Sequence, residues 1–218
     1  MANSKILTIL TALEFVAAAV VILLDLLVPT LVILAMILVS LLIRREGLAS
    51  LGFKRPQSWL RMAGLAFLGG MFLQLFHVSV SMPVLNRLTG ATIDYSGFTS
   101  LKGNLGQLAL YLVLSWTLAG LGEEMVYRGY LQKLGFSLFG SGPLGIALTF
   151  GISSLLFGLA HSEQGFIGAV LSTIDGLFFS WLKLKFNNNL WAAVLAHAFG
   201  NSIGMIIFYF TGPIYGLW

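Results

Sequence analysis

Two acidic residues stand side by side in an otherwise apolar part of the chain, and an arginine follows one helical turn later. Glu124 and Arg128 are four residues apart, which is the spacing of an ion pair on one face of a helix. Glu123 is rotated from Glu124 by about 100° on a helix, so it faces another direction. One carboxylate can therefore be neutralised by the arginine while its neighbour stays available for chemistry. The alternative is that both acids and the arginine form one buried pairing network.

Two histidines lie in apolar runs farther along the chain. His161 follows Phe157 by four residues, and His197 precedes Asn201 by four, so each pair shares one helical face. A glutamate and a histidine can polarise a water molecule, and a histidine and an asparagine can donate hydrogen bonds to a developing oxyanion. These residue types together predict hydrolysis. Glu123, His161 and His197 also have the chemistry of an open zinc site, although the sequence has no HExxH motif and asparagine is a poor zinc ligand.

Two further polar residues lie in apolar runs. Asp175 is in the middle of one run. Acids inside a membrane are expensive and often functional, so we expect Asp175 either to line the same cavity or to pair with a buried hydroxyl. His77 lies near the end of another run, and we expect it at the membrane interface.

The composition is that of a membrane protein. Hydrophobic residues make up 58% of the chain and charged residues 9%, whereas soluble domains carry about 25% charged residues. This excludes a soluble enzyme, a disordered chain and a coiled coil. The absence of cysteine excludes disulfides and thiolate metal sites. We interpret the net charge of +4 as a signal of membrane topology and expect no nucleic-acid partner.

Continuous apolar runs predict membrane-spanning helices, because the strands of a membrane barrel would alternate apolar and polar residues. We predict an all-α, polytopic transmembrane bundle of about seven spans, with the candidate site in the last four: residues 6–24, 28–43, 60–80, 105–121, 144–160, 166–182 and 190–210. If the helix from Leu105 runs unbroken from the outside, Glu123 lies near the inner membrane face at about 1.5 Å per residue, and His161 lies near the outer face. The fourth helix is then expected to be broken, tilted or shortened, and Gly120 and Gly122 offer a break.

Basic residues indicate the orientation. Five of them gather between the second and third runs: Arg44, Arg45, Lys54, Arg55 and Arg61. The positive-inside rule places this connection and the N-terminus in the cytoplasm, and the C-terminus outside. The first run is expected to stay as an anchor rather than to be a cleaved signal peptide.

The chain is expected to form a single membrane domain of three regions. Residues 1–59 hold the first two spans and a basic interfacial segment, 60–104 hold the third span and a polar outside loop, and 105–218 hold the catalytic core. Apolar and cationic residues alternate over 51–59, ending in Trp59, and this predicts contact with anionic lipid. A substrate-docking patch is the alternative.

Three motifs stand in order on apolar segments: Glu123-Glu124-x-x-x-Arg128-Gly129, Phe157-x-x-x-His161 and His197-x-x-x-Asn201. They resemble the motifs of the CPBP family, which comprises the type II CAAX prenyl endopeptidases and the bacteriocin-processing (Abi) proteins of bacteria. The resemblance covers about residues 105–210, and residues 51–56 also resemble a segment that precedes the core in bacterial members. The chain departs from the family in two ways: Tyr127 stands where phenylalanine is commoner, and we count seven spans where eukaryotic relatives have eight.

The resemblance implies an intramembrane endopeptidase. Glu123 and His161 would activate the attacking water, and His197 and Asn201 would form the oxyanion hole. Members have been described as metalloproteases, and a metal-free mechanism has also been argued for the family. We expect a metal-independent reaction without a cofactor. The alternative is zinc bound by Glu123, His161 and His197.

The resemblance also implies supporting roles and partners. Glu124 with Arg128 would hold its helix in place, and Phe157 would pack beside the site. The expected partners are a peptide or lipidated protein substrate and anionic lipid, in a bacterial inner membrane. A non-catalytic alternative is a bacteriocin-immunity protein that keeps the motif residues as a buried polar network. A transporter is a third option, and the completeness of the motifs favours the enzyme.

Overall fold

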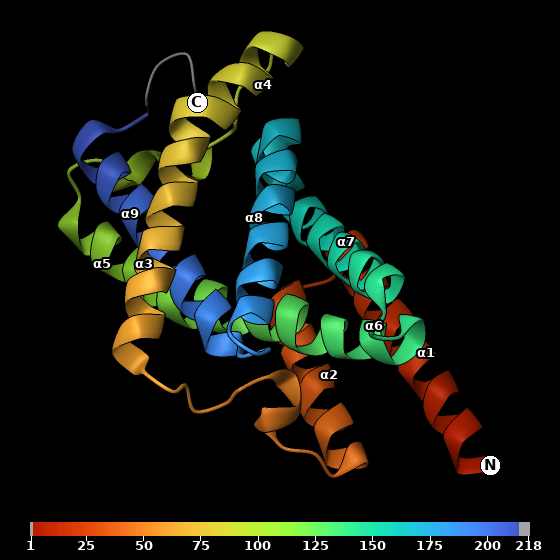
Figure 1. Ribbon diagram of the computed structural model, residues 1–218. Helices are drawn as coiled ribbons and strands as arrows, with labels where there is room; N and C mark the ends of the chain where they lie inside the picture. Colours follow the sequence, from red (N-terminus) through yellow and green to blue (C-terminus); the bar gives the residue numbers. More distant parts are fainter. Residues whose placement is uncertain (1, 214–218) are drawn as a thin grey trace.

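The computed structural model describes residues 2–213, with side chains from Lys5 onward, and over this part of the chain it is helical without a strand (Figure 1). The predicted all-α, polytopic bundle is confirmed. The α-helices are α1 (Ala2–Leu23), α2 (Pro29–Arg44), α3 (Trp59–Phe76), α4 (Met82–Thr89), α5 (Leu105–Leu114), α6 (Gln132–Phe139), α7 (Pro143–Leu159), α8 (Gly165–Lys185) and α9 (Leu190–Thr211). Three wider π-helical segments are η2 (His77–Ser81), η4 (Ser115–Glu123) and η5 (Met125–Leu131). The 3-10 turns are η1 (Leu48–Leu51), η3 (Ser96–Leu101) and η6 (Ser162–Gln164).

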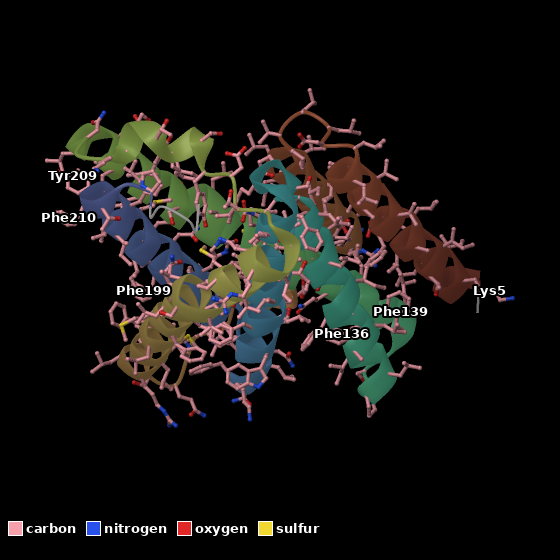
Figure 2. The ribbon with its side chains drawn as sticks, turned by 90° about the horizontal axis from the view of Figure 1, so that it is seen from above. Lys5, Phe136, Phe139, Phe199, Tyr209 and Phe210 are labelled. Carbon is pink, nitrogen blue, oxygen red and sulfur yellow. The ribbon has the colours of Figure 1, made fainter. Side chains whose placement is uncertain are left out.

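All seven predicted apolar runs are helical, but their lengths differ from the prediction. Five helices of the described chain are long and apolar enough to cross a membrane: Lys5–Leu23, Trp59–Thr89, Leu105–Phe139, Ser162–Lys185 and Leu190–Thr211. Pro29–Arg44 and Pro143–Leu159 are apolar but shorter. Large apolar side chains cover the outside of the bundle, including Phe139 and Phe210 (Figure 2). This is the surface expected of an integral membrane protein. The predicted outside position of the C-terminus falls on residues 214–218, outside the described residues.

The fourth apolar helix does not break at Gly120 and Gly122. Leu105–Phe139 is one continuous helix of 35 residues, and both glycines lie in the π-helical segment η4. The expected end at residue 121 is therefore wrong, and Glu123 lies about midway along the helix. At about 1.5 Å per residue the helix exceeds the roughly 30 Å of a bilayer core, so it must tilt or project. The site is thus built at mid-helix, and Glu123 and His161 line the same cavity although this helix is unbroken.

Side chains of α8 hold the widened turns of η5. The ammonium group of Lys183, which is buried, donates to the carbonyl oxygen of Arg128 and, at 3.3 Å, to Oε1 of Gln132. Nε2 of Gln132 donates to the hydroxyl of Ser180 at 2.7 Å. A π-helical turn displaces carbonyl groups from regular α-helical pairing. These bonds to α8 therefore fix the register of the segment that carries Arg128.

Close backbone contacts fix the other site helices. Helix α3 packs along α9, and α7 packs along α8. A Cβ atom at Gly70 of α3 would lie 2.5 Å from the carbonyl oxygen of Ala196, one residue before His197. A Cβ at Gly158 of α7 would collide with Thr173 of α8. Small residues let membrane helices approach closely, and here they bring α3 to α9 and α7 to α8.

The connection between α2 and α3 docks on the beginning of α9 (Figure 1). The amide of Leu190 donates to the carbonyl oxygen of Gly52 at 2.8 Å, and Nδ2 of Asn189 donates to that of Lys54 at 2.9 Å. Trp191 packs edge-on against Phe53 at 5.0 Å between ring centroids. Part of the predicted interfacial segment therefore anchors the helix that carries His197, while Lys54, Arg55 and Trp59 remain exposed.

The two N-terminal helices cover the opposite side of η5. Side chains of α1 and α2 pack with those of η5 and α7 in one buried apolar cluster that includes Ile33, Ile37 and Tyr130. Arg44 of α2 donates to a carboxylate oxygen of Glu14 of α1 at 2.7 Å. This cluster and ion pair hold α1 and α2 together as a wall beside the motif helix.

Candidate active site

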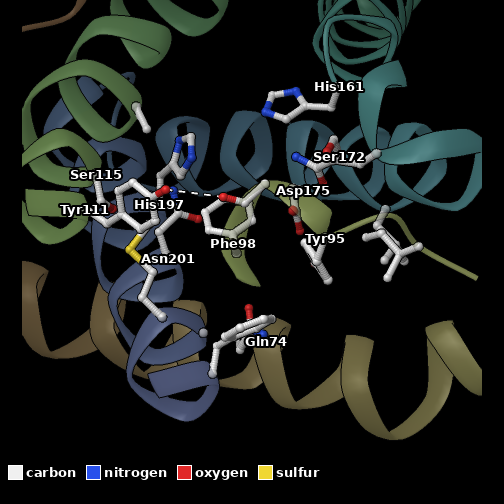
Figure 3. Close-up of a pocket in the computed structure, with 18 of the residues that line it drawn as sticks. Gln74, Tyr95, Phe98, Tyr111, Ser115, His161, Ser172, Asp175, His197 and Asn201 are labelled. Atoms are coloured by element: carbon white, nitrogen blue, oxygen red, sulfur yellow. Dashed lines mark hydrogen bonds between the residues drawn. The ribbon is translucent and has the colours of Figure 1, made fainter. Parts of the chain in front are cut away.

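A cavity of about 470 Å³ lies between the middle of the Leu105–Phe139 helix and α3, α7, α8 and α9. Six of the eight predicted site residues line it: Glu123, Phe157, His161, Asp175, His197 and Asn201. They come from four helices and are spread over almost eighty residues of sequence. Figure 3 shows His197 and Asn201 reaching the cavity from α9, with His161 and Asp175 on a neighbouring side. The structure therefore brings the three motifs to one hollow.

Glu124 and Arg128 are the two predicted site residues behind the cavity wall, and both side chains are fully buried. Nη1 of Arg128 donates to Oε1 of Glu124 at 2.9 Å. The guanidinium lies 4.3 Å from the ring centroid of Phe157 and 5.4 Å from that of Phe179. Cation–π contacts of this kind are strongest when water is excluded. The predicted ion pair forms, and it is enclosed by aromatic rings of α7 and α8.

Glu123 faces the cavity and does not join that ion pair. Its side chain is 18% exposed, compared with 0% for Glu124. Its Oε2 is buried, accepts no hydrogen bond from the described residues, and lies 3.9 Å from Nε2 of His197. The structure thus separates the two acids as their helical offset predicts. One carboxylate is neutralised, and the other presents lone pairs to the cavity.

His197 links the buried ion pair to the cavity. Its Nδ1 lies 2.9 Å from Oε1 of Glu124, and its ring stacks on Phe179 at 5.0 Å with an interplanar angle of 17°. Because a carboxylate only accepts hydrogen bonds, Nδ1 must carry the hydrogen. Glu124 and Phe179 therefore fix the ring so that Nε2 points toward the cavity and Glu123.

His161 is also held through Nδ1, but by a backbone oxygen rather than by a carboxylate. Its Nδ1 lies 2.8 Å from the carbonyl oxygen of Phe157, one turn earlier on α7. A carbonyl oxygen only accepts, so Nδ1–H donates, and in the neutral ring Nε2 carries a lone pair. The ring of Phe157 lies 4.6 Å from that of His161 and 5.8 Å from that of His197, between the two histidines. His161 is thus set to accept a proton at Nε2.

Several residues of the cavity were missed or misplaced by the sequence analysis. His77, expected at the interface, is buried, and its Nε2 lies 2.7 Å from Oδ1 of Asp175. Its position in an apolar helix is the signal that marks it as a candidate. Gln74 of α3 and Tyr95, from the loop before α5, also line the cavity. No pattern in the sequence marks these two residues, because only the packing of α3 and of the loop brings them to the site.

Tyr95 lies outside the membrane-spanning helices, at the edge of the cavity beside Asp175 (Figure 3). Burial raises the pKa of the Tyr95 phenol, and the nearby carboxylate of Asp175 raises it further. Both effects disfavour the phenolate. Tyr95 is therefore neutral at physiological pH and adds no charge to the cavity.

The three candidate zinc ligands do not form a ligand cluster. Among the residues that the structure describes, no group of three or more His, Cys, Asp or Glu side chains is placed to hold a metal ion. Nδ1 of His161 and Nδ1 of His197 donate to protein oxygens, which leaves Nε2 of each ring toward the cavity. Glu123, His161 and His197 thus line one cavity without being drawn together into a ligand cluster in the described structure.

The comparison with known families agrees with the motifs. Residues 105–203 match the family model described as type II CAAX prenyl endopeptidase Rce1-like. This segment includes Glu123, His161, His197 and Asn201, and it excludes α1 to α4. No curated protein and no solved structure matches the sequence.

The buried ion pair leads to a stability prediction. Glu124→Ala and Arg128→Ala should each lower the free energy of unfolding by about 3–5 kcal/mol, because each leaves an unpaired charge in the membrane interior. Thermal unfolding of purified protein in detergent measures the change. The control is Glu46→Ala, which removes the partner of Lys133 at a partly exposed site and should cost about 1 kcal/mol or less. Equal melting of the wild type and both buried-pair variants would contradict the pairing.

Proposed function

We propose that the protein is an intramembrane endopeptidase whose chemistry is centred on Glu123, because residues 105–203 match the family model of the Rce1-like type II CAAX prenyl endopeptidases. The observation that carries the proposal is the unequal state of the two adjacent acids. Glu124 is neutralised by Arg128, whereas Glu123 faces a cavity that it shares with two histidines and Asn201.

In the proposed mechanism, Glu123 and His161 activate a water molecule. Both groups present lone pairs, so each can accept one hydrogen bond from the same water. Glu123 takes a proton as the water oxygen attacks the carbonyl carbon of the scissile bond. The proton then passes to the leaving amine as the carbon–nitrogen bond breaks, which returns Glu123 to its carboxylate form.

His197 and Asn201 stabilise the oxyanion of the tetrahedral intermediate. They lie one turn apart on α9 and both line the cavity. When His197 is protonated at both nitrogens, Nδ1–H donates to Glu124 and Nε2–H points into the cavity. The side-chain amide of Asn201 supplies the second donor. The bond to Glu124 holds this donor in place before the reaction, and such preorganisation is a large part of electrostatic catalysis.

We further propose that the substrate is a peptide or a lipidated protein at the membrane, and that the reaction needs neither a metal nor a cofactor. The metal-free reaction rests on the two lone-pair acceptors of the cavity, Glu123 and Nε2 of His161, which can activate a water molecule themselves. Exposed Lys54, Arg55 and Trp59 support contact with anionic lipid beside the start of α9. In a bacterial inner membrane, a peptide precursor or membrane protein is the expected substrate class.

The first test of the function is Glu123→Gln, which keeps the size of the side chain but removes its ability to accept a proton. We expect cleavage to be abolished and the melting temperature to stay unchanged, because Glu123 is not part of the buried ion pair. Mass spectrometry of prenylated and unprenylated peptides incubated with purified protein measures cleavage. Glu163→Gln, at an exposed acid outside the cavity lining, is the control and should retain full activity. Equal cleavage by Glu123→Gln and wild type would remove Glu123 from the mechanism.

The second test concerns the metal. Prolonged dialysis against a chelator should leave activity intact, and His197→Gln should lose about 10²–10³-fold, because one of two oxyanion donors is weakened. The same peptide assay measures both, and elemental analysis gives the metal content. Stoichiometric metal, together with loss of activity on chelation and its return with zinc, would overturn the metal-free mechanism.

A third test concerns orientation, for which we propose a cytoplasmic N-terminus. The chain has no cysteine, so single introduced cysteines report accessibility without background. Gln57→Cys and Ser100→Cys replace exposed residues on connections predicted to lie on opposite sides. A membrane-impermeant maleimide should label Ser100→Cys in intact cells and Gln57→Cys only after lysis. The reverse pattern would invert the topology.

A further inference from the structure

A second ionisable pair lies in the cavity beside the candidate catalytic residues. Asp175 of α8 and His77 of η2 are joined at 2.7 Å, and their side chains are 27% and 6% exposed. His77 stands in a π-helical segment outside residues 105–203, the segment that the family model matches. None of the three motifs contains either residue. The pair is therefore a feature of this chain that the proposed mechanism does not use.

The contacts of the His77 ring show how it holds Asp175. Its Nδ1 is buried and has no hydrogen-bond partner among the described residues. The ring is held instead through Nε2, which lies 2.7 Å from Oδ1 of Asp175. His77 thereby orients the Asp175 carboxylate.

The cavity as a whole is acidic. Two carboxylates line it, Asp175 and Glu123, and no lysine or arginine of the described residues does. The nearby Arg128 is already paired with Glu124 behind the wall. Glu123 has Nε2 of His197 at 3.9 Å, whereas Asp175 has only its bond to His77 within the described part of the chain. A carboxylate in a membrane protein is costly unless it is hydrated or paired with a cation. A basic side chain of a substrate would supply such a cation to Asp175.

We infer that Asp175, oriented by His77, is a specificity-determining residue that binds a lysine or arginine side chain of the substrate while Glu123 acts on the scissile bond. The inference rests on the proposed endopeptidase function and narrows its substrate class. More than a quarter of the Asp175 side chain is open, so a basic group in the cavity can reach it. The same two carboxylates repel a free C-terminal carboxylate near the site. The favoured substrate is thus an apolar peptide with a basic residue close to the cleaved bond, cut internally.

The test uses pairs of apolar peptides, acetylated at the N-terminus and amidated at the C-terminus, that differ only by lysine, methionine or glutamate at one position near the cleavage site. The purified full-length protein should cleave the lysine peptide with a kcat/KM about 10- to 100-fold above that for the methionine peptide, and the glutamate peptide most slowly. Asp175→Asn should bring the lysine-to-methionine ratio close to one, mainly by lowering kcat/KM for the lysine peptide. Asp175→Glu should keep the preference, and Glu163→Gln is the matched control for the loss of one exposed acid.

Two results would overturn the inference. One is a lysine preference in Asp175→Asn equal to that of the wild type. The other is an equal loss of cleavage for all three peptides in Asp175→Asn, which would indicate a general rather than a specificity role. Thermal unfolding of each variant shows whether the fold is retained. If Asp175→Asn does not fold, the inference is tested by the lysine-to-methionine ratio of kcat/KM in the wild type and in Asp175→Glu. A ratio near one in the wild type would then overturn it.

Binding to Glu123→Gln separates this inference from the proposed function. Fluorescence anisotropy with labelled peptides should show the lysine peptide bound about 10-fold or more tightly than the methionine peptide. The additional Asp175→Asn change should remove the difference. Peptide discrimination without cleavage by the wild type would support the basic subsite and refute the protease. Cleavage by the wild type without discrimination would support the protease and refute the subsite.

Discussion

A fully buried ion pair inside a membrane bundle is the constraint on which the site depends. Separating Glu124 from Arg128 would strand a charge where no water can reach it, so each neighbouring helix must complete the pair's surroundings. Phe157 of α7 and Phe179 of α8 close over the guanidinium, and His197 of α9 binds the same oxygen of Glu124 as the arginine. Helices that carry the other motifs are thereby held around one point. The ion pair thus positions the cavity residues from behind the wall without lining the cavity itself.

Two π-helical segments, η4 and η5, surround the adjacent acids. They flank Glu124 on both sides, and Lys183 binds a carbonyl oxygen that belongs to the second segment. π-Helical turns are rare and often mark functional sites, because they displace one residue from regular register. Here the helix stays continuous past Gly120 and Gly122, and Glu123 remains at mid-helix. Continuity lets a single long helix carry both the reactive acid and the neutralised one.

Much of this arrangement was predictable because it depends on local spacing. The four-residue offset of Glu124 and Arg128 predicts their pair, and apolar runs predict the helices. The extent of the fourth helix was not predictable, because its continuation past the two glycines depends on contacts with α8 that no local pattern encodes. His77 was misplaced for a similar reason: its partner Asp175 is 98 residues away. The 51–56 segment also gave no sign that its backbone would anchor α9 at Leu190.

The acids of the site therefore divide into three kinds by what neutralises them. Glu124 has an arginine of its own helix, and its role is structural. The ionisable partner near Glu123 in the described structure is His197, whose Nε2 lies 3.9 Å from Oε2 of the acid. At this distance the lone pairs of Glu123 remain available. Asp175 has a hydrogen bond with a histidine contributed by η2, outside the family-matched segment, and faces the cavity. Glu123, Glu124 and Arg128 all lie within that segment. The setting of Asp175, unlike that of the two adjacent acids, therefore depends on how α3 and η2 pack against the matched core.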